Sequence, residues 1–272
     1  MSPRRRLGQH FLADHAAVRA IADALAPAPE DVVLEIGPGR GALTVELVKR
    51  TPRVVAVEID TELVPILRRD VPGPLVVVEG DVLERTFREI AAAAGPVPER
   101  LLVAGNLPYS ISKPIAMKLV RERADIGRAL LMFQREVARR ITAAPGRRAY
   151  GPISVLTRRA FEVRCLFDLP PGAFRPAPRV WSTVTAWVRR AEDGFDEAAE
   201  RRLRRCLRVA FTRRRRTLHN NLRAVQPDTA RVARLLAVTG VDGTLRPEGV
   251  TPAEYDRLAQ AWDILEDRAP HD

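Results

Sequence analysis

The sequence has few cysteines, few histidines and no long apolar run. Two cysteines in 272 residues, Cys165 and Cys206, are too few for a disulfide scaffold or a cysteine-rich metal site. The four histidines are scattered without the spacing of metal ligands, so we expect no metal. No apolar stretch approaches the roughly 20 residues needed to span a membrane. No long apolar segment follows the basic N-terminus either, and we expect a cytoplasmic protein.

Lysine is scarce, while arginine is abundant. The chain has 45 basic residues and a net charge of +11, yet its only lysines are Lys49, Lys113 and Lys118. Arginine binds phosphate in a forked geometry and stacks on bases. A coding bias would spread arginine evenly, but residues 201–223 hold ten arginines and no acid. This clustering predicts that the segment binds nucleic acid.

Short apolar runs alternate with amphipathic segments in the first half of the chain. Apolar residues at helical spacing, such as Leu43 and Leu47, predict helices at residues 42–50 and 63–69. Continuous apolar strands separated by helices are typical of a mostly parallel sheet that is covered on both faces. The strands are expected at residues 32–36, 54–58, 75–78, 101–105 and 129–133.

The pattern changes after Tyr150. Residues 161–169 and 182–188 are expected to be two further strands, paired antiparallel at a sheet edge, because no helix separates them. The link at 170–178 is too rich in proline for a helix or a central strand, which predicts a stiff loop.

The residue pattern becomes helical beyond about residue 190. Leu203, Leu207 and Phe211 share a helical face, and Leu218 and Leu222 repeat the spacing. We therefore predict an α/β domain with a seven-stranded sheet over residues 1–190 and a small α-helical domain over residues 191–272.

A glycine-rich turn follows the first predicted strand. In Gly37-Pro38-Gly39-Arg40-Gly41, the glycines would let a ligand approach the backbone closely. Glu58 closes the second strand, where an acid suits the two hydroxyls of a ribose. The turn and the acid together predict a nucleoside-containing cofactor. NAD is compatible with the spacing, since alanine is tolerated at the last position of the dinucleotide fingerprint.

Two polar residues after later strands favour a different cofactor. Asp81 follows the third strand and would accept a hydrogen bond from the exocyclic amine of an adenine. Asn106 adds another acceptor after the fourth. Acceptors around a compact, positively charged nucleoside suit S-adenosylmethionine better than a pyrophosphate. Asp81 could instead serve only as the N-cap of the next helix.

The segment Asn106-Leu107-Pro108-Tyr109-Ser110-Ile111-Ser112 presents an amide, a rigid ring and an aromatic together. Ligands of open α/β sheets bind at the carboxyl ends of strands, where this segment lies. Asn106 offers a donor and an acceptor to the edge of a heterocycle, and Tyr109 offers a face for a base. The simpler alternative is a strand-to-helix turn, in which asparagine and proline are common.

The combined motifs resemble class I methyltransferases that act on adenine N6. Arg6-Leu7-Gly8-Gln9-His10-Phe11-Leu12 resembles the N-terminal motif of one branch, the rRNA adenine dimethyltransferases. Residues 213–222 and 246–255 are similar to the housekeeping (KsgA-type) members. Two departures are small: Trp181 stands where an acid is usual, and His10 where asparagine is also common. The motifs that carry the resemblance are 35–39, 58–60, 80–81, 106–109, 134–137, 150–151, 174–180 and 211–218.

The resemblance implies a Rossmann-like class I methyltransferase fold and assigns a role to each motif. His10 and Leu12 would border S-adenosylmethionine, Gly37 would face its methionine part, Glu58 its ribose and Asp81 its adenine. Gln9, Gly39, Ile59, Val82 and Asn106 complete the expected cofactor site.

The implied reaction dimethylates N6 of two adjacent adenines near the 3′ end of 16S rRNA in the small ribosomal subunit, by a monomer with a role in subunit biogenesis. The Asn106 side-chain carbonyl and the Leu107 backbone carbonyl would accept the two amine hydrogens, and Pro108 would hold the second carbonyl still. Tyr109 would stack on the base, with Phe174 on its other face unless that ring is simply core. The expected RNA contacts are Arg4, Arg5, Arg6, Arg147, Arg148, Arg213, Arg214, Arg215 and Arg216.

Three other functions remain open at this stage. A DNA adenine-N6 methyltransferase would share the cofactor turn and a similar catalytic motif, but the N-terminal motif and the short helical domain argue against it. An assembly factor with little catalysis would not need the intact acceptors Glu58, Asp81 and Asn106. A 23S rRNA methyltransferase of the macrolide-resistance type is the nearest alternative.

Overall fold

The computed structural model describes residues 9–191 and 195–266 of the chain. Its contacts define two compact units, divided between residues 189 and 190, with residues 139–161 grouped in the second unit. The predicted domain boundary lies one residue away from that division, but the prediction left 139–161 in the first domain. These residues join the second unit because they bond to it: Arg159 pairs with Asp256 at 2.5 Å, and the Tyr150 hydroxyl donates to the Val250 carbonyl.

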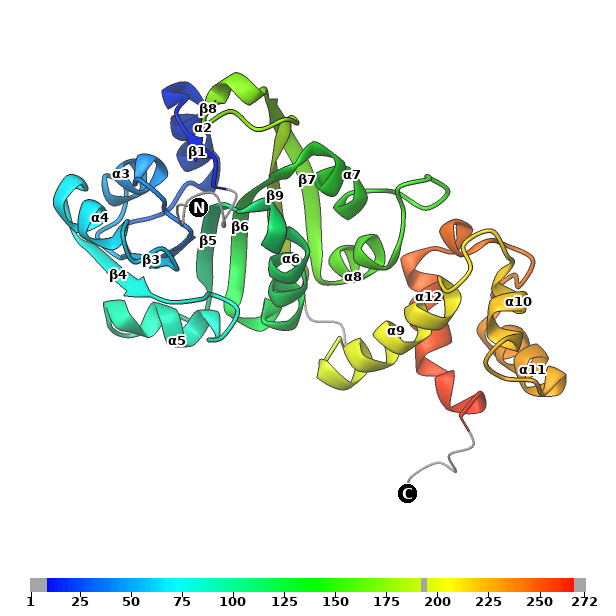
Figure 1. The fold of residues 1–272 in the computed structure, drawn as a ribbon. Helices are drawn as coiled ribbons and strands as arrows, with labels where there is room; N and C mark the ends of the chain where they lie inside the picture. Colours follow the sequence, from blue (N-terminus) through cyan, green and yellow to red (C-terminus); the bar gives the residue numbers. More distant parts are fainter. Residues whose placement is uncertain (1–8, 192–194, 267–272) are drawn as a thin grey trace. The chain divides into compact units, whose positions relative to one another are not determined.

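A seven-stranded sheet forms the centre of the first unit (Figure 1). The strands follow the order β4-β3-β2-β5-β6-β9-β7; β2 to β6 pair in parallel, and β9 runs antiparallel to β6. This confirms the predicted class I methyltransferase architecture. The bounds are β2 Val33–Ile36, β3 Val54–Glu58, β4 Leu75–Glu79, β5 Leu101–Asn106, β6 Ile126–Gln134, β7 Phe161–Leu169 and β9 Ser182–Arg189.

Helices cover both faces of the sheet. On one face, Val18, Leu43 and Leu67 of three helices join Val33 and Leu130 of the strands in one buried cluster. Neighbouring strand residues point to the opposite face, because side chains alternate along a strand. The helices of the first unit are α2 His15–Leu25, α3 Ala42–Val48, α4 Val64–Asp70, α5 Phe87–Ala91 and α6 Ser112–Arg121; α7 Arg135–Ile141 runs from it into the second unit.

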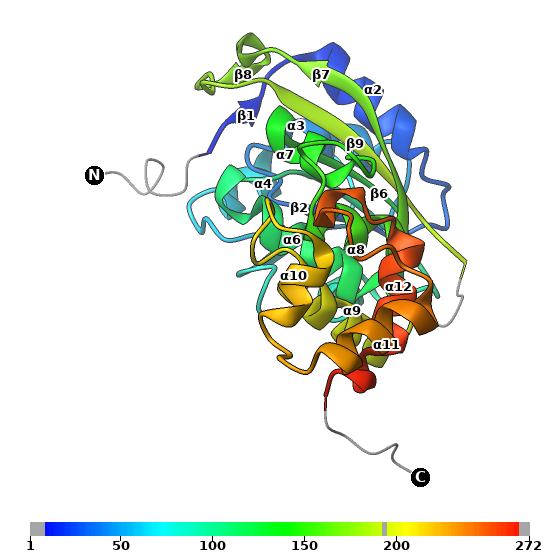
Figure 2. The same cartoon turned by 90° about the vertical axis from the view of Figure 1, so that its right-hand side faces the viewer.

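The strands that sequence periodicity predicted are present within a few residues of their expected bounds. One small sheet was not predicted: β1 Phe11–Leu12 pairs antiparallel with β8 Phe174–Arg175 (Figure 2). Two residues are too short for a period-2 pattern, so no signal marked either strand. The proline-rich link is otherwise the expected loop, with a short 3₁₀ turn at Pro171–Ala173.

The second unit is helical. Leu203, Leu207, Leu218 and Leu222 are buried as predicted, while Phe211 is partly exposed. The helices are α8 Pro152–Ala160, α9 Glu197–Ala210, α10 Leu218–Arg223, α11 Thr229–Thr239 and α12 Pro252–Gln260.

Neither a membrane span nor a metal cluster occurs in the part of the chain that the structure describes. No helix there is long and apolar enough to cross a bilayer. No group of three His, Cys, Asp or Glu side chains there could hold a metal ion.

Candidate active site

A cavity opens at the carboxyl ends of the parallel strands of the first unit. It lies where β2, β3, β4 and β5 end, which is the expected ligand edge of such a sheet. Every residue predicted from the sequence to bind the cofactor lines this one cavity. The lining comprises residues 9–12, 35–40, 42–43, 57–59, 80–82, 106, 108 and 110–111.

The glycine-rich turn forms the floor of the cavity and depends on its glycines. Gly37 and Gly39 both have positive φ, +62° and +60°, which L side chains rarely adopt. A Cβ at Gly39 would lie 2.8 Å from Cδ1 of Phe11. The backbone conformation requires glycine at both positions, and at Gly39 the close Phe11 ring leaves no room for a side chain.

Glu58 is held from both sides at the end of β3. Its two carboxylate oxygens accept from the backbone amides of Gly39 at 3.0 Å and Asp60 at 2.9 Å. Burial nevertheless raises the pKa of this carboxyl, while the amide bonds oppose the rise. Each oxygen has a second lone pair that could accept a ribose hydroxyl.

Glu35 lines the cavity, but no role was predicted for it from the sequence, although it belongs to the motif at residues 35–39. It interrupts the apolar run of β2 with a charged group, which was the available signal. The side chain is 2% exposed, and its Oε2 has no hydrogen-bond partner among the described residues. Burial raises the pKa of Glu35 to about 8. An orphaned buried carboxyl at the cavity wall fits a cationic ligand such as S-adenosylmethionine.

The raised pKa predicts how the ligand-free protein responds to pH. Between pH 4.5 and 8 the folded state holds a proton on Glu35 that the unfolded state has released, so stability falls as pH rises through that window. Glu35→Gln removes this dependence. We expect the variant to gain about 2–4 kcal/mol on the wild type between pH 5.5 and 9, measured by urea unfolding. Parallel stability profiles for the two proteins would contradict the shift.

Asn106 is oriented by the N-terminal segment. Its Nδ2 donates to the backbone carbonyl of His10 at 2.8 Å. A carbonyl can only accept, so the amide nitrogen must face His10 and the Oδ1 acceptor faces away from it. The neighbouring Pro108 lies 3.9 Å from the Cβ position of Gly37. This contact brings the segment Asn106–Tyr109, the predicted catalytic segment, against the glycine-rich turn. The geometry presents one fixed acceptor at the cavity wall.

Tyr109 does not line the cavity but contacts residues beside it. Its hydroxyl is 2.9 Å from the Ser182 hydroxyl, and its ring centroid is 5.5 Å from that of His10. Burial raises the pKa of Tyr109, so the phenol stays neutral. The ring is partly exposed, which leaves room for a base against it.

Phe174 does not fit the stacking role predicted for it. The ring is fully buried and packs in the core with Leu12, Leu169 and Ala173. β8 holds it there by pairing with β1. The alternative weighed from the sequence, core packing, describes this residue.

The loop after β4 holds Asp81 as part of a turn. Asp81 Oδ1 accepts from the backbone amide of Leu83 at 2.8 Å, whereas the N-cap of α5 is Thr86. The helix-capping role considered from the sequence is therefore not the role of Asp81. With Ile59 and Val82, this residue lines the cavity.

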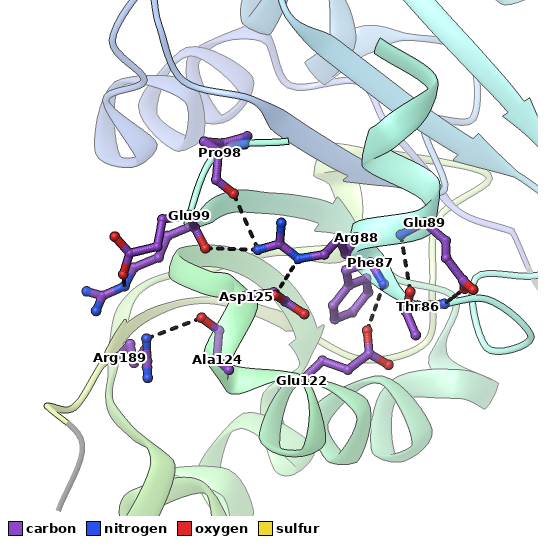
Figure 3. A network of polar contacts seen from close by, with 11 residues as sticks. Thr86, Phe87, Arg88, Glu89, Pro98, Glu99, Glu122, Ala124, Asp125 and Arg189 are labelled. Carbon is purple, nitrogen blue, oxygen red and sulfur yellow. Dashed lines mark hydrogen bonds and ion pairs between the residues drawn. The ribbon is translucent and has the colours of Figure 1, made fainter. Parts of the chain in front are cut away.

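A buried lysine fastens this loop to α6. Lys118 donates to the Arg85 carbonyl at 2.6 Å and to Glu122 at 2.5 Å, and Glu122 also accepts from the backbone amide of Phe87. Figure 3 shows the continuation of the network, in which Arg88 bonds to Asp125. The loop that follows Asp81 and the helix that follows the catalytic segment are thus tied together.

Two of the three lysines allow a matched test of the contacts that Lys118 makes. Lys118→Met leaves the Glu122 carboxylate without its cation, and we expect a loss of about 3 kcal/mol in the free energy of unfolding. Lys49→Met removes an exposed helical ion pair with Glu46 and should cost less than about 1 kcal/mol. Denaturant unfolding of both variants provides the comparison, and equal losses would show that burial of the Lys118 pair is unimportant.

The predicted RNA-binding arginines of the second unit are exposed. Residues 213–216 form a turn between α9 and α10, and Arg147 and Arg148 lie in the loop before α8. Arg214 joins the two groups, since its guanidinium donates to the backbone carbonyls of Arg148 and Tyr150. The structure thus brings together two segments that are 66 residues apart. Arg4, Arg5 and Arg6 lie outside the described residues.

Comparison with known families identifies the chain. A family model described as ribosomal RNA adenine dimethylase matches residues 1–262. The chain belongs to the ribosomal RNA adenine dimethylase family. It is therefore an S-adenosylmethionine-dependent rRNA adenine dimethyltransferase, as the sequence motifs predicted. The unpartnered Oε2 of the buried Glu35 carboxyl at the cavity wall fits that cationic cofactor.

Curated relatives within this family cover almost the whole chain. The ribosomal RNA small subunit methyltransferase A of Acidobacterium capsulatum is 42% identical, over 97% of this chain and 92% of that protein. The protein of the same name from Magnetococcus marinus is 40% identical, over 95% and 91%.

Solved structures show the same fold. The 23S rRNA methyltransferase ErmE superposes with a TM-score of 0.71 at 30% identity, over 93% of this chain and 99% of that chain. A dimethyladenosine transferase from Plasmodium falciparum gives a TM-score of 0.78 at 24% identity, over 92% and 96%. The second similarity supports the fold alone.

Proposed function

We propose that the protein transfers methyl groups from S-adenosylmethionine to N6 of two adjacent adenines near the 3′ end of 16S rRNA. The products are N6,N6-dimethyladenines in the small ribosomal subunit or its precursor. The choice of subunit rests on the names of the curated relatives, which are small subunit methyltransferases at about 40% identity. We further propose that the enzyme acts as a monomer in the cytoplasm, during subunit biogenesis.

The observation that carries the mechanism is the hydrogen bond from Asn106 Nδ2 to the His10 carbonyl. It leaves Oδ1 as an acceptor for one hydrogen of the target amine. The backbone carbonyl of Leu107 would accept the other, held by the fixed φ of Pro108. The adenine amine is a weak nucleophile because its lone pair is delocalised into the ring. Two acceptors would localise that pair and aim it along one direction.

The other residues of the site would bind and orient the cofactor and the target base. When bound, S-adenosylmethionine supplies an electrophilic methyl group on a sulfonium. Glu35 and the glycine turn would face the methionine end, Glu58 the ribose, and Asp81 with Ile59 and Val82 the adenine. Gln9, His10 and Leu12 would close the cavity from the N-terminal side. Tyr109 would stack on the target base, at about 1–3 kcal/mol. No residue of the segment Asn106–Tyr109 is a general base, so water would take the proton that the methylated amine releases.

Methyl transfer to defined substrates tests the proposed function. Labelled S-adenosylmethionine is supplied with small subunits lacking the dimethyladenines, with large subunits and with duplex DNA. We expect label in small subunits alone, mapped to two adjacent adenines near the 3′ end of 16S rRNA. Label in 23S rRNA would favour the activity named for ErmE, the structural relative at 30% identity.

A further inference from the structure

Trp181 differs from the other two tryptophans of the chain. Trp187 and Trp262 are buried, at 0% and 3% exposure, whereas Trp181 is 42% exposed. Exposing a large aromatic ring to water has a cost that burial against a partner would recover.

Trp181 lies just before β9, next to the carboxyl end of β6. Trp181 directly precedes Ser182, whose hydroxyl contacts the Tyr109 hydroxyl at 2.9 Å. Ser182 also pairs with Gln134, the last residue of β6. Asn106 is the last residue of the neighbouring strand β5, so both positions lie at the carboxyl ends of adjacent parallel strands. Trp181 does not line the cofactor cavity. Trp181 is therefore an exposed ring outside the cofactor cavity, one residue away from the contact between Ser182 and Tyr109.

Arg135 holds this tryptophan and gives its surroundings positive charge. The backbone amide of Arg135 donates to the Trp181 carbonyl at 2.9 Å, and its guanidinium carbon lies 5.5 Å from the ring centroid. Two acids belong to these surroundings: Asp168 lies 3.9 Å from the Arg135 guanidinium and accepts from Thr183, and the exposed Glu136 follows Arg135 in the chain. The segment that leads to Trp181, residues 170–181, contains no acid. Its two arginines, Arg175 and Arg179, are exposed.

A nucleotide, which combines a planar base with a phosphate, matches these features. Exposed aromatic rings beside arginines are the usual platform on which proteins stack unpaired bases, and the arginines accommodate the backbone. A target adenine drawn out of its stack leaves its neighbours unstacked as well. We propose that Trp181, held by Arg135, stacks on the base of a nucleotide adjacent to the target adenosine. The proposal deepens the proposed function and rests on it.

Kinetics of RNA methylation give the first test, with matched variants. Trp181→Ala should raise KM for unmethylated small subunits about tenfold or more, with kcat and the dissociation constant of S-adenosylmethionine nearly unchanged. Trp181→Phe keeps a stacking face and should recover most of the loss. Val188→Ala changes an apolar residue of similar exposure (39%) on β9, the strand that follows Trp181, and should behave as wild type. An unchanged KM in Trp181→Ala would overturn the proposal.

Fluorescence gives a second test that needs no turnover. Because Trp187 and Trp262 are buried, stacking should quench mainly Trp181. A short RNA hairpin with two adjacent adenines in its loop should quench the wild-type protein and leave Trp181→Phe unquenched. Equal quenching of both proteins would refute stacking. Failure of wild-type protein to methylate any small subunit would instead refute the proposed function, and the fluorescence result would still stand.

Discussion

Asn106→Ala is expected to lower kcat by about 10³-fold, the cost typical of removing one preorganised polar group from a transition state. The dissociation constant of S-adenosylmethionine should change far less. The cofactor has many other contacts along the cavity, whereas the target amine depends on two acceptors. Single-turnover methylation of small subunits measures the first quantity, and calorimetric titration with the cofactor the second.

A second substitution at the same position separates orientation from the mere presence of an acceptor. Asn106→Asp keeps two oxygens, but a carboxylate cannot donate to the His10 carbonyl. The oriented amide is then lost, and we expect activity nearly as low as that of the alanine variant. Asn220→Ala, an exposed asparagine on α10, is the control of the same residue type. Near-normal methylation by Asn106→Ala would refute the mechanism.

Reversing the arginine turn is expected to weaken RNA binding on the order of a hundredfold and to reduce its salt dependence. The triple variant changes Arg213, Arg215 and Arg216 to Glu and keeps Arg214. Arg214 is excluded because its guanidinium bonds to the Arg148 and Tyr150 carbonyls, so that its loss would also disturb the loop before α8. Each lost phosphate contact lowers the slope of log affinity against log salt by about 0.7–0.9. For three lost contacts, the slope should therefore fall by about two to three.

A control variant with the same change in net charge separates direct RNA contacts of the arginine turn from general electrostatic attraction to the whole protein. Arg68, Arg69 and Arg100 are exposed arginines of the first unit that pair with Glu79, Asp70 and Glu99. Changing them to Glu alters the net charge of the protein by the same amount. Binding of small subunits over a range of salt concentrations compares the two variants. If both lose affinity and slope equally, the arginine turn contributes only through the total charge.

The sheet could be predicted from the sequence because its signals are local. Continuous apolar runs mark β2, β3 and β5, and the polar residues that follow them mark the cavity edge. Parallel pairing then brings Gly37, Glu58, Asp81 and Asn106 together without further information. Family resemblance supplied the remaining site residues.

Features that depend on distant contacts could not be predicted. Two-residue strands such as β1 carry no period, so the pairing of Phe11–Leu12 with Phe174–Arg175 left no trace in the sequence. The burial of Phe174 follows from that pairing, and the sequence could only present it as an alternative. Residues 139–161 belong to the second unit through Tyr150 and Arg159, whose partners lie about a hundred residues later in the chain.

The segment from Gln9 to Leu12 has a consequence for the catalytic cycle. It is a wall of the cofactor cavity, it supplies the carbonyl that orients Asn106, and its His10 ring bonds to the Pro176 carbonyl at 2.8 Å. Lifting the segment to exchange the cofactor for its product would break these bonds together. Any displacement of residues 9–12 is therefore coupled to the orientation of the Asn106 amide, because the same segment lines the cavity and supplies the His10 carbonyl.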